Sequence, residues 1–264
     1  MSNEHVDYEL VGETAVITLT NPDLRNALTL DMAQGIREAI DDVTDSDARC
    51  VVLQGSGGSF CAGGDIESML EAISGDADID TLIEEAGTPV NKTVQDVYEC
   101  PLPTIAKVDG PAYGAGGALA IACDLVIASE RAELSFGFQR IGLSVDSGTS
   151  YLLPRVVGEN TAMDLVMRDR VLDATEAADL GLVQEVYPTE EFDERAQDVV
   201  DDVASGPTLA LKQTKDHIQH GLDRSMDEAI DNEIEALKEI FHTQDFSEGV
   251  SAFLERRTPE FEGN

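Results

Sequence analysis

Residues 104–118 read Thr-Ile-Ala-Lys-Val-Asp-Gly-Pro-Ala-Tyr-Gly-Ala-Gly-Gly-Ala. The β-branched run at 104–108 predicts a strand, and the small residues at 115–122 predict a helix. A helix that begins where a strand ends leaves backbone N–H groups unsatisfied and carries partial positive charge there. Glycine and alanine let a ligand oxygen approach those groups closely. The stretch therefore predicts an α/β fold with an oxygen-binding turn near residue 114.

A second glycine-rich turn has the same plan. Residues 59–66 read Ser-Phe-Cys-Ala-Gly-Gly-Asp-Ile and follow a strand predicted at 50–53. Two N–H groups from two such turns can converge on one oxygen and form an oxyanion hole. Either turn alone is equally explained by tight packing between a strand and a helix. Neither turn matches a Walker loop or a dinucleotide-binding fingerprint, so a nucleotide cofactor is poorly supported.

The rest of the chain predicts two regions. Strands at 15–19 and 125–128 alternate with helices at 29–43 and 66–73, which indicates a mainly parallel sheet with crossover helices. Beyond residue 150 the periodicity is helical, at 161–168, 175–180, 192–205, 207–221, 225–241 and 247–256. We expect a core at 1–200 and a helical region at 201–264. The acidic stretch 68–98 is interpreted as either a lid or a surface excursion.

The charge balance is extreme. The 264 residues include 17 Lys plus Arg against 53 Asp plus Glu, for a net charge of −36, and lysine occurs five times. The acids are spread along the chain, which favours a halophilic surface, although an ordinary acidic protein fits as well. Such a surface repels phosphates, so neither nucleic acid nor an anionic membrane is an expected partner. A phosphate-bearing ligand would need local help from N–H groups or arginines.

The cysteines and histidines indicate no metal site. Cys50, Cys61, Cys100 and Cys123 are widely spaced beside apolar residues, which is typical of buried free thiols. The four histidines lack zinc-ligand spacing. The N-terminal segment is polar and acidic, and no apolar run reaches membrane-spanning length. We therefore expect a cytoplasmic protein.

Taken in order, several motifs resemble the enoyl-CoA hydratase/isomerase (crotonase) family. The resemblance spans residues 8–261 and rests on Arg-Asn-Ala-Leu at 25–28, the turns at 59–66 and 110–124, Ile-Gly-Leu at 141–143, Leu-Pro-Arg at 153–155, Ala-Asp-Leu-Gly-Leu-Val at 178–183 and Ala-Phe-Leu-Glu-Arg-Arg-Thr-Pro at 252–259. It implies the crotonase (ClpP-like) fold, a spiral of ββα units with a C-terminal helical trimerisation region. It also implies a homotrimer or hexamer and an acyl-CoA substrate. No metal or redox cofactor is required, since coenzyme A belongs to the substrate.

The resemblance also assigns site residues. The N–H groups of Gly64 and Ala115 would bind the thioester oxygen, which gains charge as a proton leaves the neighbouring carbon. The residues that would line the substrate channel are Arg25, Ala27, Ala62, Gly63, Asp65, Ile66, Tyr113 and Gly114.

The acid–base residues favour an isomerase. The two glutamates of the family's hydratases align with Ala118 and Phe138, which cannot move a proton. Asp146 matches the aspartate of isomerase-type members, and the pattern around it resembles the ring-1,2-epoxyphenylacetyl-CoA isomerases of the phenylacetate pathway. Without the resemblance, the residue type and position favour Asp146 as the N-cap of a short helix at 147–153, and the resemblance reverses that preference.

Other readings stay open. Tyr151 is a candidate for the acyl pocket, Glu133 is expected to be exposed, and Asp124 is expected to hydrogen-bond backbone where a strand begins. Besides an Asp146 isomerase, the sequence allows another crotonase reaction, namely hydration, thioester hydrolysis or decarboxylation. It also allows a non-catalytic acyl-CoA-binding protein.

Overall fold

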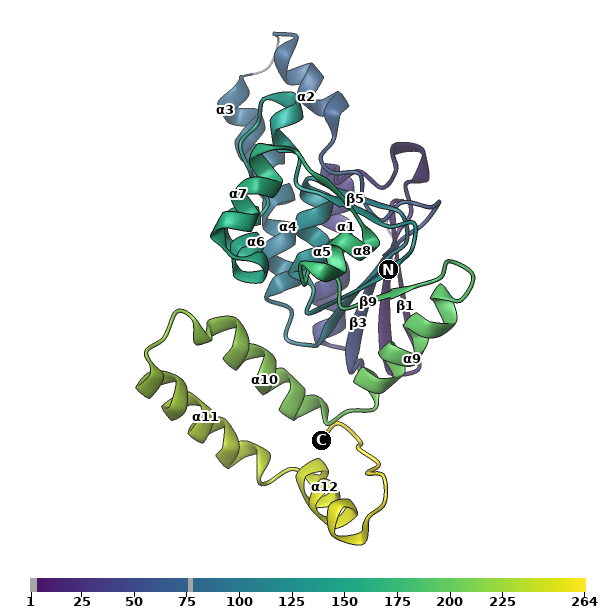
Figure 1. Ribbon diagram of the computed structural model, residues 1–264, viewed down its shortest axis with the longest axis vertical. Coiled ribbons are helices and arrows are strands. Elements are labelled where there is room, and N and C mark those ends of the chain that lie inside the picture. Colours follow the sequence, from purple (N-terminus) through teal and green to yellow (C-terminus); the bar gives the residue numbers. More distant parts are fainter. Residues whose placement is uncertain (1–3, 76–77) are drawn as a thin grey trace.

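The computed structural model describes residues 4–75 and 78–264, and its core is built on one long sheet (Figure 1). The strand order is β1-β2-β3-β4-β6-β9. Their bounds are β1 Val6–Val11, β2 Thr14–Leu19, β3 Cys50–Gly55, β4 Thr104–Val108, β6 Leu125–Ser129 and β9 Glu185–Tyr187. Strand β1 pairs antiparallel with β2, and every later pairing in this sheet is parallel. The predicted, mainly parallel α/β sheet is confirmed.

A smaller sheet supports the second glycine turn. It has the order β5-β7-β8, with β5 at Pro111–Tyr113, β7 at Glu133–Ser135 and β8 at Val171–Asp173. Strands β5 and β7 are parallel, and Tyr113 pairs with Ser135 at the end where β5 leads into the next helix. The start of that helix is therefore fixed by strand pairing on one side.

Helices cover the sheets and carry the buried apolar faces. Those of the core are α1 Leu30–Thr44, α2 Ile66–Ile73, α3 Ile79–Leu82, α4 Thr88–Tyr98, α5 Ala115–Ala122, α6 Thr149–Val157, α7 Glu159–Met167, α8 Ala174–Asp179 and α9 Phe192–Ala204. Short turns occur at Pro22–Leu24, Ile83–Gly87 and Phe138–Ile141. Helix α1 begins as predicted, because the Thr29 hydroxyl accepts a hydrogen bond from Met32 N–H at 3.1 Å.

The stretch 68–98 is not one lid. Its second half is α4, which buries Thr93, Val94 and Val97 against α1. Helices α2 and α3 form the first half and lie at one end of the molecule (Figure 1). Residues 76 and 77 fall outside the described part of the chain. The apolar residues of α4 have ordinary helical spacing. The acidic residues that precede them made the stretch 68–98 look like one polar segment.

The C-terminal helices α10 Thr208–Gly221, α11 Met226–Ile240 and α12 Gln244–Glu255 leave the core at the end opposite α2 and α3 (Figure 1). The predicted division at residue 200 lies inside α9, which packs Phe192, Ala196 and Val200 against the long sheet. Polar contacts hold α10 to the core. The Lys215 ammonium donates to Leu102 O at 3.0 Å and pairs with Asp124 at 2.7 Å.

Candidate active site

The first glycine turn lies along the turn that contains Arg25 and Ala27. Leu28 N–H donates to Gly63 O at 2.7 Å, and Ala62 N–H donates to Arg25 O at 3.0 Å. Asn26 is fully buried with a φ of 57°, and its side chain links the turn that contains Arg25 to the first glycine turn. Its Nδ2 donates to Ser59 O at 2.8 Å and to Ser56 O at 2.9 Å. No separate role is predicted for Asn26 from the sequence, because its buried left-handed conformation is visible only in three dimensions.

The second turn lies directly against the first. Tyr113 N–H donates to Cys61 O at 2.9 Å, and Gly114 N–H donates to Ser135 O at 2.8 Å. A Cβ placed on Gly116 would stand 2.1 Å from Cys61 O, so the two segments can approach only because residue 116 has no side chain. Hydrogen bonds and close packing thus bring the two predicted turns together.

The predicted donors Gly64 and Ala115 lie at this junction. Gly63 has a φ of +105°, and a Cβ on it would stand 2.9 Å from Tyr113 O and 3.9 Å from Ala115 N. Ala115 opens α5, so its N–H has no partner within the helix. Within residues 4–75 and 78–264, no hydrogen bond recorded for the backbone uses the N–H of Gly64 or Ala115. Two free amides from separate segments therefore lie beside each other.

Apolar residues occupy both positions where the family's hydratases carry glutamate. Ala118 is fully buried in α5. Phe138 is buried at the start of the turn Phe138–Ile141, and its ring lies 4.0 Å from the Cβ position of Gly114. The structure thus brings residue 138 to the second turn and places an aromatic ring there.

Asp146 is half-buried, and the interpretation of it as a helix cap is wrong. Helix α6 begins at Thr149 rather than 147, and its N-cap is Gly148, without a side-chain capping bond. The backbone oxygen of Asp146, not its carboxylate, accepts from Thr149 N–H at 2.9 Å. The carboxylate Oδ1 is buried and has no hydrogen-bond partner among the described residues. Burial raises the pKa of Asp146, and hydrogen bonding by Ser147 opposes the rise.

Tyr113 connects the second turn to nearby charges. Its hydroxyl donates to the carboxylate of Glu133, which is exposed as predicted. Burial first, and then the Glu133 carboxylate, raise the pKa of Tyr113 to about 12, while Arg140 and Arg25 act in the opposite direction. Two arginines therefore lie near Tyr113 in a chain whose overall charge is strongly negative.

The remaining channel candidates border the first turn. Ala27 is buried, Ala62 is partly exposed and Ile66 is 55% exposed. The Asp65 carboxylate caps α2, accepting from Glu67 N–H at 3.0 Å and from the Ser68 hydroxyl at 2.5 Å. Its side chain thus has a local structural role whether or not it also borders a ligand.

Tyr151 does not support its assignment to an acyl pocket. Its hydroxyl donates to Asp223 at 3.1 Å, and the Arg155 guanidinium stacks 3.4 Å from its ring. Arg155 also pairs with Asp223 at 3.1 Å. This cluster joins α6 to the end of α10. By contrast, Asp124 takes the predicted role at a strand entry, since its carboxylate accepts from Thr104 N–H at 2.7 Å.

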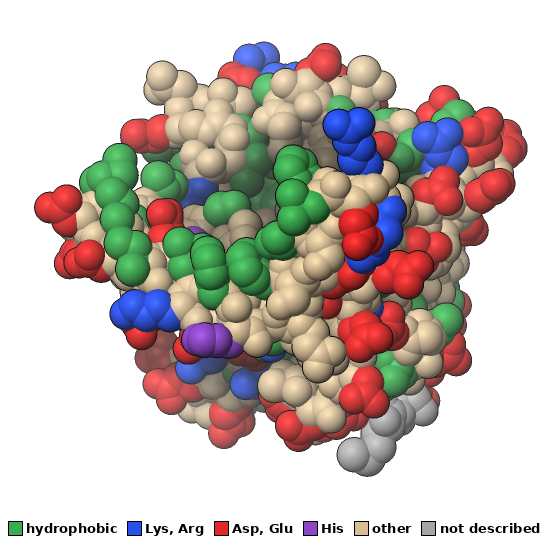
Figure 2. Space-filling view, turned by 90° about the horizontal axis from the view of Figure 1, so that it is seen from below, with side chains coloured by type: hydrophobic (Ala, Val, Ile, Leu, Met, Phe, Trp, Pro, Cys, Tyr) green, Lys and Arg blue, Asp and Glu red, His purple; other side chains and the backbone are tan. Residues whose placement is uncertain are grey.

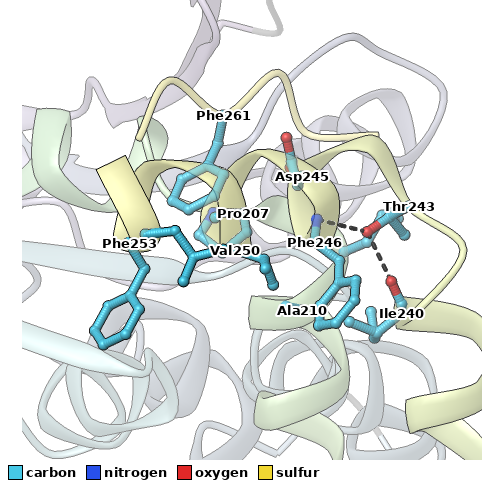
Figure 3. A pocket seen from close by; sticks show the side chains of 12 residues that line it. Pro207, Ala210, Ile240, Thr243, Asp245, Phe246, Val250, Phe253 and Phe261 are labelled. Atoms are coloured by element: carbon cyan, nitrogen blue, oxygen red, sulfur yellow. Dashed lines mark hydrogen bonds between the residues drawn. The ribbon is translucent and has the colours of Figure 1, made fainter. Parts of the chain in front are cut away.

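A distinct apolar hollow of about 380 Å³ lies among the C-terminal helices (Figure 3). Phe246, Val250, Phe253 and Phe261 line it, with Ile240 at one end. The buried Asp245 beside it accepts from the N–H groups of residues 262 and 263 at 2.8 and 2.9 Å, which ties the C-terminal tail to α12. Among the described residues that line the hollow, Asp245 carries the one carboxylate, and both of its oxygens are used in these hydrogen bonds, so the hollow is not the candidate active site.

No helix in the described residues is long and apolar enough to cross a membrane. Over the same residues, no three His, Cys, Asp or Glu side chains are grouped so that they could hold a metal ion. All four cysteines are buried and free, as predicted.

A sheet spiral with two abutting glycine turns and a C-terminal helical region defines the crotonase class. The sequence pattern of the enoyl-CoA hydratase/isomerase family matches residues 11–264, so the chain belongs to that family. It is 36% identical over 264 residues, the whole of both chains, to a Rhodobacter capsulatus protein named "Probable enoyl-CoA hydratase". It is 33% identical over 249 residues, 94% of each chain, to the 1,2-epoxyphenylacetyl-CoA isomerase of Escherichia coli.

Solved structures agree with this assignment. An enoyl-CoA hydratase/isomerase from Cupriavidus metallidurans superposes with a TM-score of 0.90 at 32% identity, covering all of this chain and 98% of the other. The chain is thus an enzyme of this family with the crotonase fold. The names of its relatives include both hydratases and isomerases, so they do not choose between the two reactions.

Proposed function

We propose that this enzyme is an enoyl-CoA-type isomerase in which Asp146 moves the proton. Two observations together support the proposal. One carboxylate oxygen of Asp146 is buried without a hydrogen-bond partner among the described residues, and the side chains at 118 and 138 are apolar. Hydration needs a water molecule to be oriented and a proton to be delivered, which normally takes positioned carboxylates at both steps. Moving a double bond needs a single base that can return the proton it takes.

The proposed reaction has two steps. Asp146 takes a proton from a carbon next to the double bond, and the electron pair moves through the conjugated system onto the thioester oxygen. The N–H groups of Gly64 and Ala115 donate to that oxygen and stabilise the enolate, each by about 3 kcal/mol. The protonated Asp146 then returns the same proton to a different carbon, so no atom is gained or lost and no cofactor is consumed.

Substrate binding is proposed to follow the junction of the two turns. Arg25, Ala27, Ala62, Gly63, Asp65 and Ile66 would border the coenzyme A portion, and Tyr113 and Gly114 would border the thioester. Arg25 is exposed and lies near Tyr113, which supports a role in attracting phosphates against the acidic surface. The proposed setting is the cytoplasm, and the proposed assembly is a trimer or a dimer of trimers.

Hydration is the second candidate, because the Rhodobacter capsulatus relative carries a hydratase name. The test is to incubate the protein in molar KCl with crotonyl-CoA, a 3-enoyl-CoA and an epoxide-bearing arylacetyl-CoA. Isomerisation of either of the last two, at rates at least about 100-fold above water addition to crotonyl-CoA, is expected. The variant Asp146→Asn should bind acyl-CoA but lose isomerisation by at least about 100-fold. Full turnover by that variant would refute the proposed function.

A further inference from the structure

The peptide that follows Asp146 is held in an unusual conformation. Ser147 is buried and has a φ of 51°, in the left-handed region that non-glycine residues seldom adopt. Such a conformation costs free energy and persists only where the surrounding structure enforces it. Its N–H is also removed from solvent, so it needs a partner inside the protein.

Asn91 of α4 supplies that partner. Its Oδ1 accepts from Ser147 N–H at 2.5 Å, although the two residues are 56 positions apart. The orientation of the Asn91 amide is fixed by its other half, because Nδ2 donates to Gly87 O at 2.8 Å. Ser147 N–H can only donate and Gly87 O can only accept, so reversing the amide would break both bonds.

Packing supports the same contact. Val94 lies one turn further along α4, and its Cγ1 is 4.0 Å from the Cβ position of Gly148, the next residue of the loop. Helix α4 is in turn fixed to α1, where the Thr93 hydroxyl reaches Ala33 O at 3.4 Å. The segment 147–148 therefore rests on a helix that is part of the buried core.

We propose that Asn91 is a positioning residue that aims the Asp146 carboxylate by holding the Ser147 peptide in its left-handed conformation. No described residue donates to Asp146 Oδ1, and the hydrogen bonding that acts on the carboxylate comes from the adjacent Ser147, so the direction of the carboxylate depends on the conformation of the 146–147 backbone. A base misplaced by about 1 Å can lose about 100-fold in rate, so a fixed backbone has a direct catalytic value. This inference rests on the proposed role of Asp146.

The principal test is Asn91→Leu, which has a similar volume but removes both hydrogen bonds. The matched control is Asn232→Leu. Asn232 lies in α11, and its Nδ2 donates to Glu228 O, four residues back, at 2.6 Å, as Asn91 does to Gly87. Isomerisation is measured in molar KCl well below the melting temperature of each variant. For Asn91→Leu we expect kcat to fall by about 10- to 100-fold, with KM changed less than about threefold. Asn232→Leu should keep both values.

Asn91→Asp separates positioning from a merely structural role. It keeps an acceptor for Ser147 N–H, so it should recover part of the kcat lost in Asn91→Leu. It also adds a carboxylate next to the Asp146 loop, which disfavours ionised Asp146 and should move the acid limb of the kcat–pH profile to higher pH.

The outcomes distinguish the two proposals. If Asn91→Leu lowers the melting temperature but keeps the wild-type kcat and pH profile, Asn91 is only structural and the inference fails. If Asp146→Asn keeps full activity, the proposed function fails whatever Asn91 does. Loss of activity in both variants, with acyl-CoA binding by calorimetry retained, is the expected result.

Discussion

When Asp146 is ionised, no described residue donates a hydrogen bond to its Oδ1. Its carboxylate is half-buried, one oxygen has no partner in the described chain, and burial raises its pKa. The pKa of Asp146 is higher in the folded state than in the unfolded chain. Folding therefore favours the protonated carboxyl over the carboxylate. The stability that this provides is present at low pH and is lost as pH rises through the folded-state pKa. At neutral pH, the ionised Asp146 should therefore destabilise the fold.

This argument predicts that Asp146→Asn stabilises the protein while abolishing isomerisation. The melting temperature of the variant should exceed that of the wild type at pH 7, by up to a few degrees, and the difference should shrink as pH falls. Thermal unfolding in molar KCl between pH 4.5 and 8 measures it, with Asp179→Asn on the exposed face of α8 as a control. A carboxylate that acted only as a helix cap would not show this gain, since Asn caps a helix about as well as Asp.

The same pKa shift predicts the pH dependence of catalysis. A base must be ionised to take a proton, so kcat should rise with pH through the folded-state pKa of Asp146, at a higher pH than an ordinary aspartate would give. Initial rates on a 3-enoyl-CoA at constant ionic strength give this profile. An acid limb at the usual aspartate value, about 3.9, would contradict the burial seen for this carboxylate.

At the scale of elements, the two glycine turns depend on one close approach. A methyl group at residue 116 would meet Cys61 O at 2.1 Å, and both atoms belong to rigid segments. Helix α5 would have to move away from the first turn, which would separate Gly64 from Ala115. Helical propensity favours Ala over Gly by about 1 kcal/mol, so the expected cost comes from contact and opposes the propensity.

We therefore expect Gly116→Ala to reduce isomerisation by at least about 10-fold and to destabilise the fold by about 1–3 kcal/mol. Gly221→Ala is the matched control, because residue 221 is also helical and a Cβ there meets no atom within 4 Å. That change should leave kcat unaltered and stability equal or higher by up to about 1 kcal/mol. Activity assays and urea unfolding of both variants compare them directly. Equal kcat values would show that the approach of the turns does not limit catalysis.

The elements that could be predicted are those with a strong local signal. Strand β4 and helices α2 and α5 have the bounds expected from the sequence, because β-branched runs and glycines mark their ends. Helix α4 was missed, although Val90, Val94 and Val97 are spaced for one helical face and Pro89 suits a first turn. Asn91 lies on that helix. Its contact with Ser147 joins residues 56 apart and depends on a left-handed backbone, neither of which a local pattern reveals.

For the whole molecule, a net charge of −36 is the dominant electrostatic fact. Mutual repulsion strains the folded state in dilute buffer, and salt screens it over a Debye length that falls from about 10 Å at 0.1 M to 3 Å at 1 M. The melting temperature should therefore rise steadily from 0.1 to 2 M KCl, and KM for an acyl-CoA should first fall as phosphate repulsion is screened. Thermal scans and initial rates across that range test this. A melting temperature independent of salt would argue for an ordinary acidic protein.

Despite this net charge, the face of the molecule that carries the C-terminal helices exposes several apolar side chains. Figure 2 shows hydrophobic side chains gathered around a hollow on this face, with acidic side chains outside it. On α12, Phe253 is 83% exposed and Leu254 is 75% exposed, and Phe241, which caps the end of α11, is 57% exposed. Full burial of a side chain of this size contributes about 1.5–3 kcal/mol, which is ample to drive association once salt screens the charge.

The family resemblance implies a trimer or a dimer of trimers, and we expect the exposed apolar side chains of α12 to contribute to that association in 2 M KCl. Phe253→Asp should raise the dissociation constant of the subunits by at least about 10-fold, because the change removes apolar area and adds charge to an interface. Light scattering after size-exclusion chromatography measures the mass. Leu70→Asp is the control, since Leu70 is also exposed but lies on α2, at the opposite end of the molecule from α11 and α12 (Figure 1). If Phe253→Asp keeps the wild-type mass, subunits do not meet through this part of α12, which lines the hollow in Figure 3.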